Sequence, residues 1–477
     1  MEKGEKRLLG VILGLALIIL VGMAGANTTI SNLLVSVQDI LALGNVNATN
    51  VYTEKLNDVL YVQSGNSTDI QAKLNSCPAI GCRVVVRAGY YNMSNTIYIP
   101  SNTTFEGVGK DTIIHLGLAD ANLISNANLR TGDKNIEIKN MKLDGNKDIS
   151  SANNGTLFFK NVSNLIIDNI QVVRGQFRAI EVTDVNSNYY VIVRNSRFED
   201  SHLDGIYMHG VHKAIIDGNF IDSAPDSGID LGGYLGNSNS EFIVTNNIIT
   251  NGGLGIGVAR DARNMLIDSN IIKNGTSHGI SLYLVGEDPT GGNTSIVSNN
   301  IVFNMSKNGI RVENSHSVVV TGNNLFGNGW RGITVENASY ISVTSNNAEL
   351  NAMEGIYVRY ANFTLVNDNM LRRNNYYGLL LEDTSHCLVN GNSAIDNDYG
   401  DSNTYAGIGI KGYSYRNFIT GNLAYITNPG MYHRYGIYIV QNTSINNTIF
   451  GNQLFQSGRV LNLRDYGLNT SLNYNFE

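Results

Sequence analysis

Residues 308–324 read NGIRVENSHSVVVTGNN, and this stretch decides the fold. A glycine precedes two apolar residues at alternate positions, Ile310 and Val312, which is the pattern of a short strand with one buried face. A polar corner follows, then a second apolar strand at 318–320, and then asparagine. The stretch therefore predicts one turn of a structure that is built from short strands and tight corners.

Glycine followed by Ile or Leu recurs through the chain at intervals of 23, 27, 24, 30, 23, 23, 23, 29 and 29 residues, so 23 is the base period and the excess residues are insertions. These glycines are Gly205, Gly228, Gly255, Gly279, Gly309, Gly332, Gly355, Gly378, Gly407 and Gly436. A fixed period in the twenties with short strands is typical of a solenoid, here a parallel β-helix with one repeat per turn. Leucine-rich repeats share this period, but their Leu-x-x-Leu-x-Leu frame is absent.

An asparagine closes each repeat in a common register, and we expect these residues to occupy corners with positive φ and to form hydrogen-bonded ladders. They are Asn219, Asn246, Asn270, Asn299, Asn323, Asn346, Asn369, Asn392, Asn422 and Asn452. The apolar residue after each glycine, and the one two positions later, should form two columns inside the helix.

Composition supports an all-β chain and argues against a nucleic-acid-binding protein. Fifty Gly and only five Pro among 477 residues suit many short strands and tight corners. The net charge of −7 and the 15% of charged residues argue against a nucleic-acid surface. One repeated unit accounts for most of the length, so several globular domains are not required.

The N-terminus predicts export. Residues 1–26 carry basic residues, an apolar run and Ala24-Gly25-Ala26, which fits either a signal peptide or a retained membrane anchor. Residues 27–57 contain apolar positions at helical spacing (30–43) and read as a helical stalk and linker, with membrane association or a homo-oligomer as possible consequences. Fifteen Asn-x-Ser/Thr sequons agree with an extracellular glycoprotein, secreted or held at the cell surface.

The three cysteines divide into two groups. Cys77 and Cys82 are close enough in sequence to form a disulfide in an oxidising compartment. Cys387 lies beside the apolar residues of a repeat, so we expect it to be buried.

The region before the regular repeats resembles a known family. A short capped helix at 67–74 leads through Cys77-Pro78 to strand patterns at 83–86, 90–91 and 96–99, and then to Gly107-Val108-Gly109. This order resembles the N-terminal cap of pectate-lyase-type proteins, which include polygalacturonases, alginate-modifying enzymes and virus tailspikes. The resemblance implies a right-handed parallel β-helix over 111–456, a cap at 58–110 that covers its open end, and a C-terminal tail at 457–477.

Function must lie on outward positions or on loops, because the interior serves stability. On the strand after each glycine, the residues two and four positions after the glycine point outward, and the residue before the glycine lies at the edge of the same face. Gly257 and Ala259 predict a depression on this face, and insertions at about 232–240 and 285–293 predict loops on either side of it. Around it we expect Asp204, His209, Asp226, Asp230, Arg260, His278 and Tyr283.

Carboxylates and histidines in such a place suit acid–base chemistry on a sugar chain, because glycosidic cleavage needs a proton donor and a second carboxylate. The segments at Asp204, Asp226, His278 and Arg311 are similar to motifs of polygalacturonases, although a single Asp226 stands where that family has paired acids. The resulting catalytic candidates are Asp204, Asp226, His278, Asp230, His209 and Arg311.

Sugar contacts are expected from aromatic and cationic side chains on the same face, because rings stack on sugars and cations pair with acidic sugars. These candidates are Tyr207, Arg260, Tyr283, Tyr357, Arg359 and Tyr377. No cofactor is required, but a Ca²⁺ site at Asp204, Asp226 and Asp230 is one option, with Arg260 or Arg311 facing the acidic sugar.

Two functions stay open at this point. One is an extracellular β-helix that binds an extended, acidic polysaccharide and cleaves or epimerises it as a lyase, hydrolase or epimerase. The other is a non-catalytic adhesin, filament subunit or virus receptor-binding spike, because a fold does not fix an activity.

Overall fold

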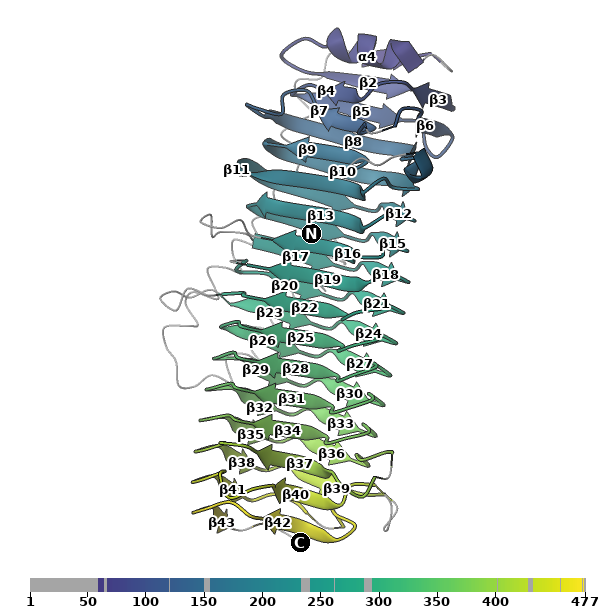
Figure 1. Ribbon diagram of the computed structural model, residues 1–477. Helices are drawn as coiled ribbons and strands as arrows, with labels where there is room; N and C mark the ends of the chain where they lie inside the picture. Colours follow the sequence, from purple (N-terminus) through teal and green to yellow (C-terminus); the bar gives the residue numbers. More distant parts are fainter. Residues whose placement is uncertain are drawn as a thin grey trace, which may run out of the picture.

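A computed structural model describes residues 59–63, 67–119, 121–149, 155–232, 241–260, 262–286, 294–400, 402–427, 432–454, 456–473 and 475. The predicted signal or anchor, the helical stalk and the larger parts of the two predicted loops lie outside these residues. The chain winds into a rod of stacked coils (Figure 1). No helix in the described part of the chain has the length and apolar character needed to cross a membrane.

Each coil contributes strands to up to three parallel sheets, which we call the first, second and third sheet in chain order. In the middle and lower parts of Figure 1 the first sheet runs up the centre of the rod, the second lies to its left and the third to its right. The strands of the first sheet are β4 (Ile97–Ile99), β7 (Ile124–Asn126), β9 (Leu157–Lys160), the start of β11 (Arg178–Arg194), β13 (Asp204–Val211), β16 (Ser227–Gly232), β19 (Leu254–Ala259), β22 (Ile280–Tyr283), β25 (Ile310–Glu313), β28 (Ile333–Glu336), β31 (Ile356–Arg359), β34 (Leu379–Glu382), β37 (Ala406–Lys411), β40 (Tyr435–Ile439) and β42 (Leu461–Asp465).

The second sheet follows the first corner of each coil. It contains β1 (Val59–Val62), β2 (Cys82–Val86), β5 (Thr103–Gly107), β8 (Asp133–Asp144), β10 (Val162–Val173), the end of β11, β14 (Lys213–Asp217), β17 (Glu241–Thr245), β20 (Leu266–Asp268), β23 (Ser295–Ser298), β26 (Val318–Thr321), β29 (Ser342–Thr344), β32 (Leu365–Asn367), β35 (Leu388–Asn390), β38 (Phe418–Thr420), β41 (Thr448–Phe450) and β43 (Ser471–Asn473).

The third sheet completes the coil. It contains β3 (Gly89–Met93), β6 (Thr112–Leu116), the ends of β8 and β10, β12 (Arg197–Glu199), β15 (Phe220–Asp222), β18 (Ile248–Thr250), β21 (Ile271–Lys273), β24 (Ile301–Phe303), β27 (Asn324–Phe326), β30 (Asn347–Glu349), β33 (Met370–Arg372), β36 (Ser393–Ile395) and β39 (Leu423–Tyr425). A 3₁₀ turn (Lys147–Ile149) lies between β8 and β9. The prediction of a parallel β-helix is therefore confirmed.

The predicted inward columns form the core. The residue after each repeat's glycine pairs in register with its equivalent one coil away, as Ile310 does with Ile280 and Ile333. The ten members of this column are fully buried. They are Ile206, Ile229, Ile256, Ile280, Ile310, Ile333, Ile356, Leu379, Ile408 and Ile437. Burial of this continuous stack stabilises the coils that it joins, each contacting only its neighbours.

The asparagines form the expected ladder, but the corner with positive φ belongs to the preceding residue. Asn346 is buried, donates to Asn369 Oδ1 at 3.0 Å, and accepts from Asn323 Nδ2 at 2.9 Å. Its predecessor Ser345 has φ 55°. In two coils both positions are asparagine, so the predicted Asn246 and Asn299 occupy corners (φ 56° and 54°) and the ladder runs through the next residues, Asn247 and Asn300.

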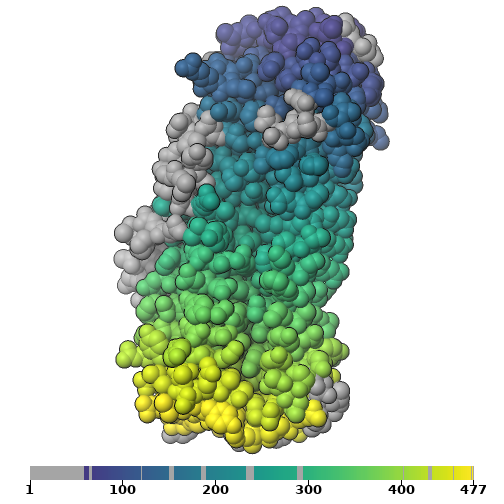
Figure 2. Space-filling view, viewed as in Figure 1, coloured from purple at the N-terminus to yellow at the C-terminus, as the bar shows by residue number. Residues whose placement is uncertain are grey.

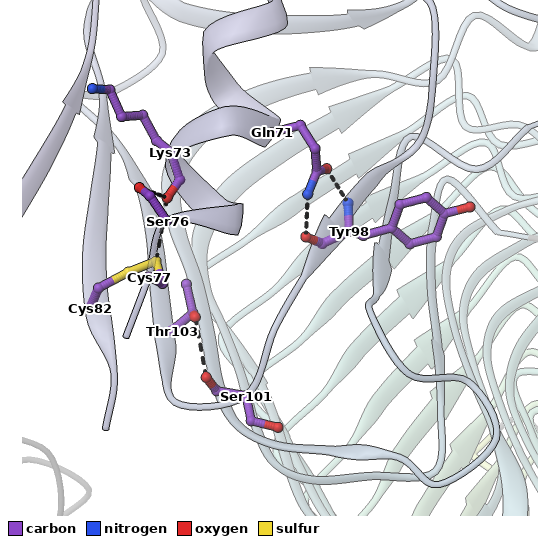
Figure 3. Close-up of a disulfide and its surroundings, with 8 residues drawn as sticks. All are labelled: Gln71, Lys73, Ser76, Cys77, Cys82, Tyr98, Ser101 and Thr103. Atoms are coloured by element: carbon purple, nitrogen blue, oxygen red, sulfur yellow. Dashed lines mark hydrogen bonds between the residues drawn. A yellow bond between two sulfur atoms is a disulfide. The ribbon is translucent and has the colours of Figure 1, made fainter. Parts of the chain in front are cut away.

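A cap closes the N-terminal end of the rod. Helix α4 (Ser67–Asn75) places Ile70 and Leu74 inward, where both are buried, and lies over the first coil (Figure 1). The Gln71 side chain donates to Tyr98 O at 3.1 Å and accepts from Tyr98 N at 2.8 Å, so it continues the strand pairing of β4 (Figure 3). A disulfide joins Cys77 to Cys82 below the helix, with 5.5 Å between the Cα atoms (Figure 3).

The coils continue beyond residue 456, where we expected a tail. β42 pairs with β40, and β43 pairs with β41, both in parallel. The boundary moves because this coil has no Gly-Ile signal and its first strand begins at an exposed leucine, Leu461. Figure 2 shows a continuous surface from the cap to this last coil.

Candidate functional site

Three of the predicted residues meet on the outer face of the first sheet. β13 pairs with β16 so that Tyr207 lies opposite Asp230 and His209 lies opposite Gly232. The alternation of buried and partly exposed residues along β13 confirms that Tyr207 and His209 point outward. We call Tyr207, His209 and Asp230 the outer triad.

The Tyr207 ring is held between two side chains, Arg178 from the preceding coil and His209 from its own strand. The Arg178 guanidinium lies 3.6 Å from the ring centroid, and the His209 ring stacks on Tyr207 with 4.0 Å between centroids and an angle of 10°. Cation–π and offset-stacked contacts of this kind hold an aromatic ring in one orientation. The tyrosine is therefore presented as a fixed surface feature.

A missing side chain allows His209 to lie flat. A Cβ at Gly232 would come within 2.7 to 2.9 Å of three atoms of the His209 ring, so only glycine leaves room for the ring. In this position His209 Nε2 lies 3.4 Å from Asp230 Oδ2, and both side chains are about a quarter to a third exposed (30% and 26%). Nε2 itself is buried and makes no hydrogen bond, so proton exchange with a ligand would use the other ring nitrogen or the Asp230 carboxylate.

Asp204 lies beneath the outer triad and is buried, with 1% of its side chain exposed. Its carboxylate accepts hydrogen bonds from Arg178 Nε at 2.9 Å and from the backbone N–H of Ser227 at 3.1 Å. Burial raises the pKa of Asp204 to about 6, and the charges of Asp230 and Asp226 add to this increase, although Arg178 opposes it. The group therefore takes up a proton near neutral pH.

Arg178 and its second acidic partner were missed by the sequence analysis. Arg178 also pairs with Glu181 at 3.0 Å, and β11 aligns with β13 so that Arg178 lies opposite Asp204. The repeat begins here with Ala179-Ile180 in place of Gly-Ile, 26 residues before Gly205. A search that allowed alanine at the glycine position would have found this coil.

Other catalytic candidates do not join this group. Asp226 is exposed, although its charge contributes to the raised pKa of Asp204. His278 belongs to β22's coil, three coils from Asp204, with Ser227 and Leu254 between them in the same column. Within the described residues no three Asp, Glu, His or Cys side chains are arranged to hold a metal ion. Asp204, Asp226 and Asp230 therefore do not come together there as the predicted Ca²⁺ site.

His278 is buried and held neutral. Burial lowers its pKa to about 4, with a further contribution from the charge of Arg311. Its Nδ1 accepts the backbone N–H of Asn308 at 3.3 Å, and its ring meets the edge of Trp330 with 6.0 Å between centroids. The predicted catalytic Arg311 is itself engaged in an ion pair with Glu313.

The expected depression at Gly257 is occupied by a neighbouring side chain. A Cβ at Gly257 would lie 2.7 Å from a methyl group of Leu254, which therefore lies across the glycine. Arg260 is exposed just after β19, and Tyr283 is 37% exposed at the end of β22.

The C-terminal coils carry a second aromatic group. Tyr357 and Tyr377 are buried (5% and 7% exposed) and belong to a cluster that also includes Leu380, Ala406 and Tyr435, with Tyr376, Tyr405 and Tyr438 packed against it. Tyr357 donates a hydrogen bond to Glu382 at 2.6 Å. Arg359 pairs with Glu336 at 3.6 Å. These three predicted sugar-contact residues are thus separate from the outer triad and partly covered.

Comparison with known proteins identifies the family of this chain. A family model described as the right-handed β-helix region matches residues 178–348 and 290–476. The chain belongs to the right-handed β-helix family. This membership, together with the parallel coils, confirms the resemblance to pectate-lyase-type proteins as far as the fold is concerned.

Individual relatives of this right-handed β-helix are distant. A pre-neck appendage protein of Bacillus phage B103 is 26% identical over 254 residues, which are 49% of this chain and 27% of that protein, so the match spans about a quarter of the curated relative. A tailspike of E. coli bacteriophage HK620, solved with a pentasaccharide, matches at TM-score 0.54 and 13% identity over 87% of this chain and 76% of that one. The A-module of the Azotobacter vinelandii mannuronan C-5 epimerase AlgE6 matches at TM-score 0.39 and 14% identity over 90% and 98% of the two chains.

Proposed function

We propose that the chain is exported, binds an extended polysaccharide along the outer face of the first sheet, and transfers protons on it at the outer triad. The observation that carries the proposal is the register of β13 with β16, which joins His209 to Asp230 beside the fixed Tyr207 ring. A parallel sheet that repeats every ~4.8 Å offers an extended ligand equivalent contacts along the rod.

The chemistry of the outer triad fits acid–base work on a sugar. Cleavage of a glycosidic bond needs a proton donor and a second acid or base, and epimerisation or elimination needs a base that removes a ring proton. His209 and Asp230 supply one such pair. Arg178 and His209 cover the two faces of the Tyr207 ring, so Tyr207 offers a sugar its hydroxyl and its ring edge. Asp204 is covered by Arg178, so we assign it a positioning role.

The sequence suggested that the polysaccharide is acidic, and this part of the expected function has the least support. A uronate needs a cation to receive its carboxylate, but Arg311 already pairs with Glu313. Arg260 is exposed beyond the end of β19 and is the other cation that we considered.

The test is a product assay. The purified chain is incubated with a panel of neutral and acidic polysaccharides, and new reducing ends, unsaturated ends and changes in uronate stereochemistry are measured. Asp230→Asn and His209→Gln should each lower the rate by at least about 100-fold, the usual contribution of a general acid or base. Glu349→Gln, which breaks a similar pair with Arg372 on the third sheet, should leave the rate unchanged.

A non-catalytic spike is the second candidate, and the similarity to a phage pre-neck appendage protein favours it. In that case the same face would bind a polysaccharide without changing it. Saturable binding with no product from any polymer of the panel would select the spike and reject the proton-transfer role. Absence of binding to every polymer would reject the polysaccharide proposal itself.

A further inference from the structure

Between β11 and β37, the cationic side chains on the outer face of the first sheet form ion pairs with acidic side chains. From β11 to β37, the outward positions and the residue before each repeat's glycine, or before Ala179 in β11, include five cations and seven acids. The cations are Arg178, Arg311, Arg331, Arg359 and Lys411, and the acids are Glu181, Asp204, Asp230, Glu313, Glu336, Glu354 and Glu382.

Every one of these five cations has an acidic partner. Arg331 Nε lies 2.6 Å from Glu354, and Lys411 Nζ lies 3.3 Å from Glu382. Arg178, Arg311 and Arg359 have the acidic partners described above. The charge of a paired cation is already offset by its partner, so it attracts a further carboxylate less strongly, and the surplus acids would repel that carboxylate.

Two further cations lie beside this face and not on it. Arg260 follows the end of β19, and Lys307 lies 5.7 Å from the Trp330 ring, next to the start of β25. They are at opposite ends of the strands, so they do not form a row along the rod. The internal stretches outside the described residues contain acids and no Lys or Arg in the sequence.

The groups that remain available on the face suit an uncharged ligand. Sugar hydroxyls can donate to paired carboxylates and accept from paired guanidiniums without breaking the pair. Tyr283 is 37% exposed and presents a ring for stacking. Uronates would gain these contacts too, but would also meet the surplus negative charge.

We propose that the ligand of this face is a neutral polysaccharide, an inference that rests on the proposed polysaccharide binding and names its substrate class. The discriminating feature is that all five cations between β11 and β37 pair with acids, so this described part of the face presents no row of free cations to a polyuronate. Arg464, which bonds to Tyr466 on the last coil, lies beyond this stretch.

The test uses matched polymers in which charge alone changes. Binding of the full chain is measured for several polyuronates and for their carboxyl-reduced forms, in which each carboxylate has become a hydroxymethyl group, together with neutral glucans, mannans and galactans. We expect the tightest binding among neutral or carboxyl-reduced polymers, at least about tenfold above the charged counterpart at low salt, and insensitive to added salt. Tighter binding of a polyuronate that weakens with salt would overturn the neutral class and leave polysaccharide binding intact. No binding to any polymer would reject the polysaccharide proposal.

A charge-release variant tests the cause. Glu313→Gln with Glu336→Gln frees Arg311 and Arg359 while keeping side-chain size, and both acids are partly exposed (18% and 31%). Affinity for the polyuronates should rise about tenfold or more at low salt, and the gain should disappear at high salt. Glu349→Gln, which frees Arg372 on the third sheet, should give no gain. An unchanged preference in the double variant would show that charge pairing is not what selects the ligand.

Discussion

At the scale of single residues, glycine decides where functional side chains can lie. Gly232 lets the His209 ring lie over the sheet, Gly257 does the same for Leu254, and a Cβ at Gly409 would come within 2.5 Å of the Tyr377 ring. None of these three glycines has a positive φ, so their role is space and not backbone conformation. A glycine on the outer face therefore indicates a neighbour that lies flat, and not a depression.

Gly232→Ala should disturb the outer triad without unfolding the chain. The new Cβ would force the His209 ring off the sheet, away from Asp230 and Tyr207. We expect a loss of activity or binding of about tenfold and a change in stability below about 1 kcal/mol, because His209 is partly exposed. Gly400→Ala is the control, because a Cβ there meets nothing within 4 Å. The His209 imidazole signals in an NMR titration report the displacement directly, and unchanged signals in Gly232→Ala would contradict it.

Asp204 makes stability depend on pH in a predictable direction. Its pKa is raised from 3.8 to about 6, so the folded state binds the extra proton between these values and stability from this group falls as pH rises through this window. Above about pH 6 the buried carboxylate is ionised, at a cost of about 3 kcal/mol, since one pKa unit corresponds to about 1.4 kcal/mol.

Asp204→Asn removes this dependence. The difference in unfolding free energy, variant minus wild type, should rise by up to about 3 kcal/mol between about pH 4 and pH 7.5. The lost contact with Arg178 lowers the stability of the variant by the same amount at every pH, so it does not affect this rise. Denaturant unfolding of both proteins across this range measures the difference. A wild-type minus variant difference that does not change with pH would show that Asp204 keeps an ordinary pKa.

At the scale of the coil, the sequence predicted the strand order because every repeat satisfies the same demands: a glycine at a crowded corner, two inward apolar residues, and a ladder asparagine. It placed Asn246 and Asn299 one residue off, because two adjacent asparagines compete for two different roles. It missed Arg178 because Ala179 hides the repeat. It grouped His278 with Asp204 around a depression expected at Gly257, which the Leu254 side chain fills.

The contacts within the candidate site depended on side-chain directions that a repeat pattern does not contain. Tyr207, His209 and Asp230 were correctly predicted to share one face, since register follows from the period. The stacking of Arg178 on Tyr207 and the tilt of His209 over Gly232 come from packing between coils, which only the structure reveals.

The asparagine ladder should be essential to the coil. Asn346 donates to Val320 O at 2.9 Å in addition to its two ladder neighbours, so Asn346→Leu leaves several buried polar groups without partners. We expect a loss of at least about 3 kcal/mol, because each unsatisfied buried group costs about 1–3 kcal/mol. Asn324→Leu, at a partly exposed position of β27, should cost below about 1 kcal/mol. Equal effects of the two substitutions on thermal unfolding would argue against the ladder.

At the scale of the whole molecule, a rod of coils has stability that is distributed along its length. Each coil pairs only with the coils before and after it, so damage at one end need not spread to the other. The cap matters because the first coil would otherwise present apolar side chains and unpaired strand edges to water. Helix α4 supplies two buried side chains and the Gln71 bonds to β4 for this purpose.

Ile70→Asp with Leu74→Asp should therefore open the rod locally from its N-terminal end. Both side chains are buried, and replacing each apolar contact with a carboxylate should cost at least about 2–5 kcal/mol in this region. Hydrogen exchange should show lost protection in β2 to β5 and unchanged protection at β28, because the loss decays through nearest-neighbour contacts. Asn75→Asp adds a single carboxylate at an exposed position of α4 and should leave both regions protected. Uniform loss of protection from cap to β28 in the double variant would mean that the coils unfold as one cooperative unit.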